Sequence, residues 1–105
     1  MKLKIKYNQL YLLLILLLPL FSLGNDKENT LFEKGNQLYT KGQYQEAVKV
    51  YQQIMNDGYS SAAIYFNTGN AYYKLDDMAS AILYYEKARK LAPNDKDINL
   101  SLIHI

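Results

Sequence analysis

The sequence predicts an all-α protein in which two similar helix-turn-helix units stack into a short α-solenoid, preceded by a signal peptide. Sliding the 105-residue chain over itself by 34 residues places identical residues on one another, which indicates an internal repeat. Apolar residues within each unit follow the i, i+4, i+7 spacing of one helix face. The superposed pairs are Phe32 and Phe66, Gly35 and Gly69, Asn36 and Asn70, Tyr39 and Tyr73, Ala47 and Ala81, and Tyr51 and Tyr85.

Residues 1–24 have the layout of a secretory signal peptide, with cleavage expected after Gly24. Lysines occupy three of the first six positions, and an uncharged, leucine-rich stretch follows over residues 10–18. Pro19 interrupts this stretch, and the small residues Ser22 and Gly24 suit a signal peptidase. The alternative is an uncleaved membrane anchor, although the apolar stretch is shorter than the roughly 20 residues of a spanning helix.

Residues 28–61 form the first predicted unit, repeat 1. A turn is expected at residues 41–43, and Gly58 is the natural end of the second helix. Gly35 and Ala47 are small, so the two helices of the unit are expected to approach closely. The positions predicted to face the core are Leu31, Gly35, Leu38, Ala47, Val48, Tyr51 and Ile54.

Residues 62–95 form the second predicted unit, repeat 2. Asp76 and Asp77 are expected to supply a turn and a helix N-cap, and Pro93 is expected to end the second helix. The positions predicted to face the core are Tyr65, Gly69, Tyr72, Ala81, Ile82, Tyr85 and Ala88.

Residues 96–105 are expected to begin a capping helix or a third repeat, with Asn94 or Asp95 as the N-cap. Ile98, Leu102 and Ile105 share one face of this helix. Because two repeats bury little surface and this helix ends on apolar residues, we expect either further sequence or self-association through it.

The composition excludes several classes of function. The chain has no Cys and one His, so thiolate metal sites and histidine-based catalysis are not expected. No phosphate-binding loop or dinucleotide motif is present, and we predict no enzyme activity, no cofactor and no bound metal. The net charge of +2 arises at the N-terminus: from Asn25 onward nine basic residues face ten acidic ones, so nucleic acid is not an expected partner.

The second unit resembles the tetratricopeptide repeat (TPR), with tyrosine at the usual tryptophan position and threonine at a leucine position. The first unit is similar but has Tyr59 where the closing proline is expected. The residues that carry the resemblance are Tyr65, Thr68, Gly69, Tyr72, Ala81, Tyr85 and Pro93. The resemblance implies a right-handed α-solenoid of TPR helix-turn-helix repeats whose role is protein–protein interaction.

A longer part of the sequence resembles the N-terminal part of the BatE family of the Bacteroides aerotolerance operon. The matching segments are residues 31–36, 65–75, 84–88 and 91–95, behind the signal peptide. That family continues into membrane helices and an SH3-like domain, which predicts that this chain is a fragment or a truncated relative. The resemblance implies export to the periplasm or cell envelope and a scaffold role beside von Willebrand A-type membrane proteins. There are two alternatives to this scaffold role. The chain could associate with itself, or it could be the accessory domain of a larger envelope enzyme.

The TPR resemblance also implies a concave groove, formed by the first helix of each repeat, that binds a protein or an extended peptide. Asparagine can donate to and accept from a peptide backbone, and aromatic rings supply contact area. The alternative is that these side chains only support contacts between helix pairs. The predicted binding residues are Phe32, Asn36, Tyr39, Phe66, Asn67, Asn70, Tyr73 and Lys74.

One specialised form of this groove is not expected. Asn36 and Asn67 occupy the positions of the two asparagines with which some TPR proteins bind a C-terminal carboxylate. The basic positions of that clamp are held here by Phe32, Asp97 and Ser101. A carboxylate would therefore lack the charge-assisted hydrogen bonds that hold it.

Overall fold

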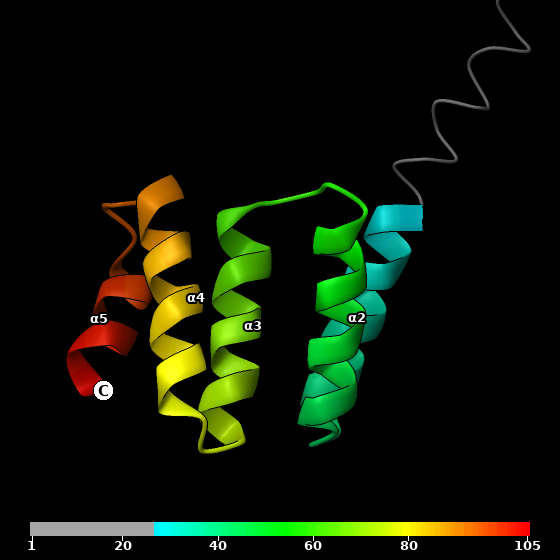
Figure 1. The fold of residues 1–105 in the computed structure, drawn as a ribbon, viewed down its shortest axis with the longest axis horizontal. Coiled ribbons are helices and arrows are strands. Elements are labelled where there is room, and N and C mark those ends of the chain that lie inside the picture. Colours follow the sequence, from blue (N-terminus) through cyan, green and yellow to red (C-terminus); the bar gives the residue numbers. More distant parts are fainter. Residues whose placement is uncertain (1–26) are drawn as a thin grey trace, which may run out of the picture.

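The computed structural model describes residues 27–105, which form a stack of helices joined by short turns (Figure 1). No strand occurs within this range, and the predicted all-α fold is confirmed. The predicted signal peptide, residues 1–24, lies outside the described residues. The helices are a segment over residues 27–40, α2 (Tyr44–Asn56), α3 (Ala62–Lys74), α4 (Met78–Leu91) and α5 (Lys96–His104). Within residues 27–105, no helix is long and apolar enough to cross a membrane.

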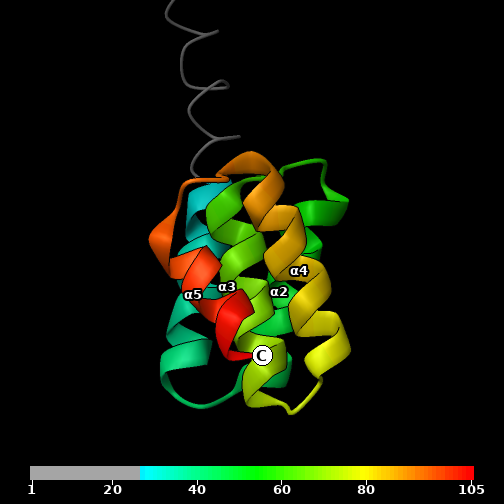
Figure 2. The same ribbon diagram turned by 90° about the vertical axis from the view of Figure 1, so that its left-hand side faces the viewer.

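Consecutive helices run antiparallel, so the chain stacks one helix pair on the next. Helix 27–40 pairs with α2, α3 pairs with α4, and α5 covers the end of the stack beside α4 (Figure 1). Viewed along the stack, α4 lies to the right, helix 27–40 and α5 lie to the left, and α3 lies between them (Figure 2). The first helices of successive pairs therefore share one side of the molecule.

The turns use residues whose backbone preferences match the local geometry. Gly42 and Gly58 have φ values of 78° and 95°, which glycine adopts without a steric penalty. Asp76 also has a positive φ, 61°, in the tight turn before α4. These positions end the preceding helices, as the sequence predicts.

Side-chain caps fix where α3, α4 and α5 begin. Ser61 accepts a hydrogen bond from the Ile64 amide, and Asp77 accepts one from the Ser80 amide. Asp95 accepts from the amides of Asp97 and Ile98, at 2.9 and 3.1 Å. The predicted caps at Asp77 and Asp95 are confirmed, and Asp95 rather than Asn94 is the N-cap of α5.

The core lies between the two layers of helices and continues from one repeat to the next. Tyr51 and Tyr85 are 1% and 2% exposed, and four of the other buried apolar residues are alanines. Ile98 of α5 is 2% exposed, so this helix completes the core beside α4. The buried apolar residues are Ala47, Val48, Tyr51, Ile54, Ile64, Ala71, Ala81, Tyr85, Ala88 and Ile98.

Two predicted core positions lie elsewhere in the structure. Ile82 is 39% exposed. It follows the buried Ala81, and successive residues of a helix are rotated by about 100°, so Ile82 points away from the buried face of α4. Ile105 is 38% exposed beyond the last turn of α5. Leu102 is half-buried, so only Ile98 of the predicted α5 stripe is fully enclosed.

Of the predicted stripe on α3, Gly69 is buried as expected, but the residues before Tyr65 and Tyr72 are buried in their place. Ile64 and Thr68 are buried, and the Thr68 hydroxyl is satisfied because it donates to the Ile64 carbonyl oxygen at 2.7 Å. Tyr65 and Tyr72 are half-buried and pack against the ring of Tyr84 on α4. Their rings thus cover the outer edge of the α3–α4 interface, while smaller side chains fill its centre.

Candidate peptide-binding groove

Each repeat holds one tyrosine in the same way. Tyr51 of α2 donates its hydroxyl to Asn36 Oδ1 at 2.5 Å, and Phe32 packs on its ring with centroids 6.2 Å apart. In the next repeat Tyr85 donates to Asn70 Oδ1 at 2.5 Å, with Phe66 at 5.6 Å. Three of the residue types that repeat at a 34-residue interval therefore form one structural unit.

A glycine makes room for each tyrosine ring. A methyl group built at Gly35 would lie 2.5 Å from Cε1 of Tyr51. The equivalent group at Gly69 would lie 2.7 Å from Cδ1 and Cε1 of Tyr85. Both distances are below van der Waals contact, so the repeated glycines are needed because the ring lies directly on the helix backbone.

The tyrosine hydroxyls are protonated far above neutral pH. Burial raises the pKa of Tyr51 and of Tyr85 from 10.0 to about 12. Desolvation disfavours the charged phenolate, and the protonated hydroxyl keeps its role as a hydrogen-bond donor. These tyrosines are structural donors to the asparagines that line the groove.

An amide hydrogen bond joins the first repeat to the second. Asn67 of α3 donates from Nδ2 to Asn36 Oδ1 at 2.9 Å, so this oxygen accepts two hydrogen bonds. One interval later the equivalent position is Ser101 of α5, whose Oγ donates to its own helix at the Asp97 carbonyl oxygen, 2.9 Å away. A side-chain hydrogen bond at this position therefore joins helix 27–40 to α3, whereas the equivalent side chain on α5 bonds within its own helix.

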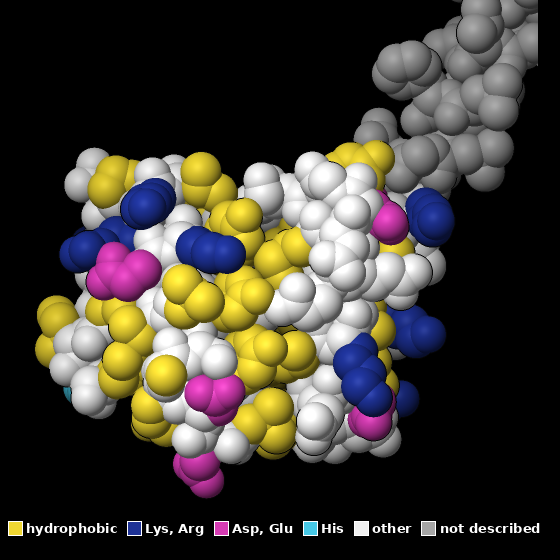
Figure 3. All heavy atoms as spheres, in the orientation of Figure 1, with side chains coloured by type: hydrophobic (Ala, Val, Ile, Leu, Met, Phe, Trp, Pro, Cys, Tyr) yellow, Lys and Arg dark blue, Asp and Glu magenta, His cyan; other side chains and the backbone are white. Residues whose placement is uncertain are grey.

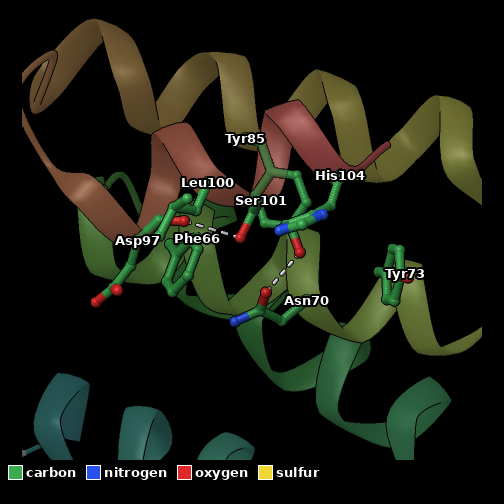
Figure 4. A pocket seen from close by; sticks show the side chains of 8 residues that line it. All are labelled: Phe66, Asn70, Tyr73, Tyr85, Asp97, Leu100, Ser101 and His104. Atoms are coloured by element: carbon green, nitrogen blue, oxygen red, sulfur yellow. Dashed lines mark hydrogen bonds between the residues drawn. The ribbon is translucent and has the colours of Figure 1, made fainter.

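A pocket of about 480 Å³ lies between α3 and α5 (Figure 4). Tyr85 reaches into it from α4, and its hydrogen bond with Asn70 forms one wall. Asp97 and Phe66 lie at one end of the pocket, and Tyr73 and His104 lie toward the other. The lining residues are Phe66, Asn70, Tyr73, Tyr85, Asp97, Leu100, Ser101 and His104.

A smaller pocket of about 150 Å³ lies between helix 27–40 and α3. Asn70 lines both pockets, so the two hollows adjoin along the side of the molecule formed by the first helices. The lining residues are Asn36, Tyr39, Thr40, Tyr51, Asn67 and Asn70. Together the two pockets define the groove as the term is used below.

The structure brings six of the eight predicted binding residues to this groove. Asn36, Tyr39 and Asn67 line the smaller pocket, Phe66 and Tyr73 line the larger one, and Asn70 lines both. Phe32 packs on Tyr51 and against the core. Lys74 is exposed at the C-terminal end of α3 and lines neither pocket.

Sequence reasoning missed the contribution of α5 to the groove. In the sequence, Asp97 and Ser101 stand out only as departures from a carboxylate clamp, and Leu100 and His104 are not among the predicted binding residues. A signal was present, because Ser61 and Asp95 cap equivalent helices and Ile64 and Ile98 are equivalent buried residues at the same 34-residue interval. The repeat extends into α5, which occupies the place of a first helix.

The opposite face of the molecule has a different character. Hydrophobic side chains gather over its centre, with Lys and Arg toward the edges (Figure 3). The rings of Tyr72 and Tyr84 stack with centroids 5.6 Å apart, and Lys87 Nζ lies 5.1 Å from the Tyr84 centroid. Gln52 of α2 donates to the Tyr84 hydroxyl at 2.6 Å, so this aromatic cluster joins the two repeats.

The fold and the groove define a helical-repeat module of the kind that binds other proteins. A sequence profile described as Tetratricopeptide repeat matches residues 32–96, which include both helix pairs. The chain belongs to the tetratricopeptide repeat family, whose members commonly act in protein–protein interaction.

Curated relatives match more than half of this chain. The chain is similar to mouse Tetratricopeptide repeat protein 16, with 31% identity over 64 residues, which is 61% of this chain and 8% of the mouse protein. The human protein of the same name is 31% identical over 61 residues, or 58% of this chain and 7% of its own length. The chain thus spans less than a tenth of the length of these relatives.

Proposed function

We propose that this protein is an exported TPR scaffold that holds an extended segment of a partner protein along the groove, as part of a bacterial cell-envelope complex. The observation that carries the proposal is the adjoining pair of pockets, of about 480 and 150 Å³, lined by side chains from both repeats and α5. Two adjoining hollows with a mixed polar and aromatic lining suit an extended chain with alternating side chains better than a single small molecule.

The groove has polar groups that can bind a peptide backbone. Among the described residues, nothing accepts a hydrogen bond from Asn70 Nδ2, and nothing donates to Asn67 Oδ1. One amide can therefore donate to a peptide carbonyl, and the other can accept from a peptide N–H. Tyr39 and Tyr73 flank these amides, and their rings can pack on side chains of the bound segment.

Site-specific photo-crosslinking tests this proposal in cells. A photoreactive amino acid replaces Tyr73 in the groove, and a second variant carries it at Leu83, which is 52% exposed on α4, as a matched control. We expect one partner protein to be captured at position 73 and absent at position 83. Equal capture at both positions, or capture of nothing at position 73, would contradict the groove proposal.

The same experiment separates the scaffold from self-association. Ile103 of α5 is 76% exposed and Leu100 is 52% exposed, so α5 offers an apolar surface to a second copy. Capture of this chain alone at position 73, abolished by Leu102→Glu, would favour the self-associating alternative. Capture of a von Willebrand A-type membrane protein would support the resemblance to BatE and a link to aerotolerance.

Export has its own test. The layout of residues 1–24 supports a cleaved signal peptide. We expect the mature protein in the periplasmic fraction to begin at Asn25 when its N-terminus is sequenced. Retention of the first 24 residues on a membrane-bound protein would favour the signal-anchor alternative.

A further inference from the structure

We propose that the bound partner segment carries a lysine or arginine side chain and seats it against Asp97. This inference rests on the proposed function and names the chemistry of the segment that the groove accepts. It depends on the charge lining the groove, on the state of the Asp97 carboxylate and on the aromatic ring beside it.

The residues that line the groove include one carboxylate and neither lysine nor arginine. Asp97 is the acidic residue of the larger pocket, and neither pocket of the groove is lined by a Lys or Arg. A neighbouring hollow of about 320 Å³ at the start of α3 and α5 shares Phe66 and Asp97 with the larger pocket and adds Asp95. The basic residues of the described chain lie outside these three hollows, although the sequence as a whole is slightly basic.

The Asp97 carboxylate lies in the first turn of α5 and forms no hydrogen bond or ion pair within residues 27–105. The Asp97 backbone N–H donates to Asp95, and its carbonyl oxygen accepts from Ser101, but no described residue forms an ion pair or hydrogen bond with its carboxylate oxygens. The residue is exposed at the junction of two hollows. A cationic side chain can therefore reach it with little rearrangement, and the hydrogen bond so formed is charge-assisted.

The neighbours of Asp97 suit the rest of a basic side chain. Phe66 lies beside it at the same end of the pocket (Figure 4), and Leu100 adds an apolar surface on α5. The methylene groups of lysine or arginine can pack on such surfaces while the charged end stays in a polar environment. The face of Phe66 also attracts a cation through the ring quadrupole. A ligand carboxylate at this end would instead meet a like charge.

Peptide selection followed by affinity measurement tests the inference. Random peptides displayed on phage are selected against the purified full chain, and the best binder is made with a fluorescent label. Two further forms of it carry norleucine or glutamate in place of the Lys or Arg. Fluorescence anisotropy compares the three forms on the wild type, Asp97→Asn, Asp97→Lys and Tyr73→Ala. Asp76→Asn is the matched control, because it removes the same charge outside the groove and asparagine tolerates the positive φ there.

We expect the selected peptides to share a basic residue at one position and norleucine to weaken binding about tenfold on the wild type. Asp97→Asn should remove that difference, Asp97→Lys should favour a glutamate peptide, and Asp76→Asn should change nothing. Circular dichroism of each variant establishes that it is folded.

The outcomes distinguish this inference from the proposed function. Peptides that lose affinity on Tyr73→Ala but show no basic preference, or that bind Asp97→Asn unchanged, would overturn the inference and leave the groove proposal intact. Failure to select any peptide that responds to Tyr73→Ala would overturn both.

Discussion

The tightest contact in each repeat joins a glycine to a tyrosine ring. Gly69 lies against Tyr85 so closely that no side chain fits, and the Tyr85 hydroxyl is fixed at its other end by Asn70. The ring therefore cannot move aside without losing a hydrogen bond. The same three-part arrangement recurs at Gly35, Tyr51 and Asn36.

We expect Gly69→Ala to destabilise the protein. Overpacking costs about 1–3 kcal/mol, and the higher helix propensity of alanine offsets about 1 kcal/mol of that. The measurement is urea unfolding of Gly69→Ala, Tyr85→Leu and the double variant. In the double variant the clash is absent, so the two changes should cost less together than the sum of their separate effects. Strict additivity would show that the contact with the ring is not the cause.

The sequence predicts this arrangement only in part. The repeated glycine and tyrosine are visible at a 34-residue interval, and helical spacing places both toward the core. The hydrogen bonds from Tyr51 to Asn36 and from Tyr85 to Asn70 are not visible, because apolar periodicity reports where a ring lies and not where its hydroxyl points. The asparagines predicted to bind a partner thus also hold the core, with one amide oxygen each.

The short helix α5 supplies many of the residues that line the larger pocket. It has nine residues, packs on α4, and supplies Asp97, Leu100, Ser101 and His104 to the larger pocket. An isolated helix of this length is unstable in water, so its position depends on burial of Ile98 and on its N-cap. Half of the residues that line that pocket therefore lie on a short terminal helix that packs on α4.

Removing the Asp95 cap should loosen α5 locally. We expect Asp95→Ala to cost about 0.5–2 kcal/mol, and to raise hydrogen exchange at the amides of α5 far more than at those of α3. Asp95→Asn, which can also cap, is the matched control and should behave nearly like the wild type. A uniform rise in exchange over all helices would mean that α5 opens only when the whole domain unfolds.

Helix positions were more predictable than helix faces. Turn glycines, Asp77, Asp95 and Pro93 mark the ends of the helices in both sequence and structure. On α3 the predicted core position Gly69 is buried, but Tyr65 and Tyr72 lie beside the core and the residues before them are buried instead. Periodicity alone does not decide which of two adjacent residues faces a narrow interface.

For the whole molecule, the two buried tyrosines link stability to alkaline pH. Their pKa is raised by burial from 10.0 to about 12, so the folded state favours the protonated form. The stabilisation is complete below pH 10, the value for the unfolded chain, and is lost as the pH rises through about 12.

We therefore expect the free energy of unfolding to fall steeply between pH 10 and 12. Tyr51→Phe combined with Tyr85→Phe should flatten that fall and cost about 0.5–1.5 kcal/mol per lost hydrogen bond at neutral pH. Urea unfolding at several pH values measures both effects. Tyr59→Phe, at an exposed position, is the control and should keep the wild-type slope. An unchanged slope in the double variant would assign the pH dependence to other groups.

The two hollows of the groove differ at several equivalent positions, among them residues 67 and 101 and residues 70 and 104. Where the repeat has Asn67, the amide reaches back to Asn36 and the space beside it measures about 150 Å³. Where it has Ser101, the shorter side chain bonds within its own helix and the space measures about 480 Å³. Residue 101 is not one of the side chains that hold the buried tyrosines, since Tyr51 and Tyr85 are each bonded to an asparagine of their own repeat. The shape of the larger hollow can therefore be changed at residue 101 by evolution or engineering while the repeated core contacts stay the same.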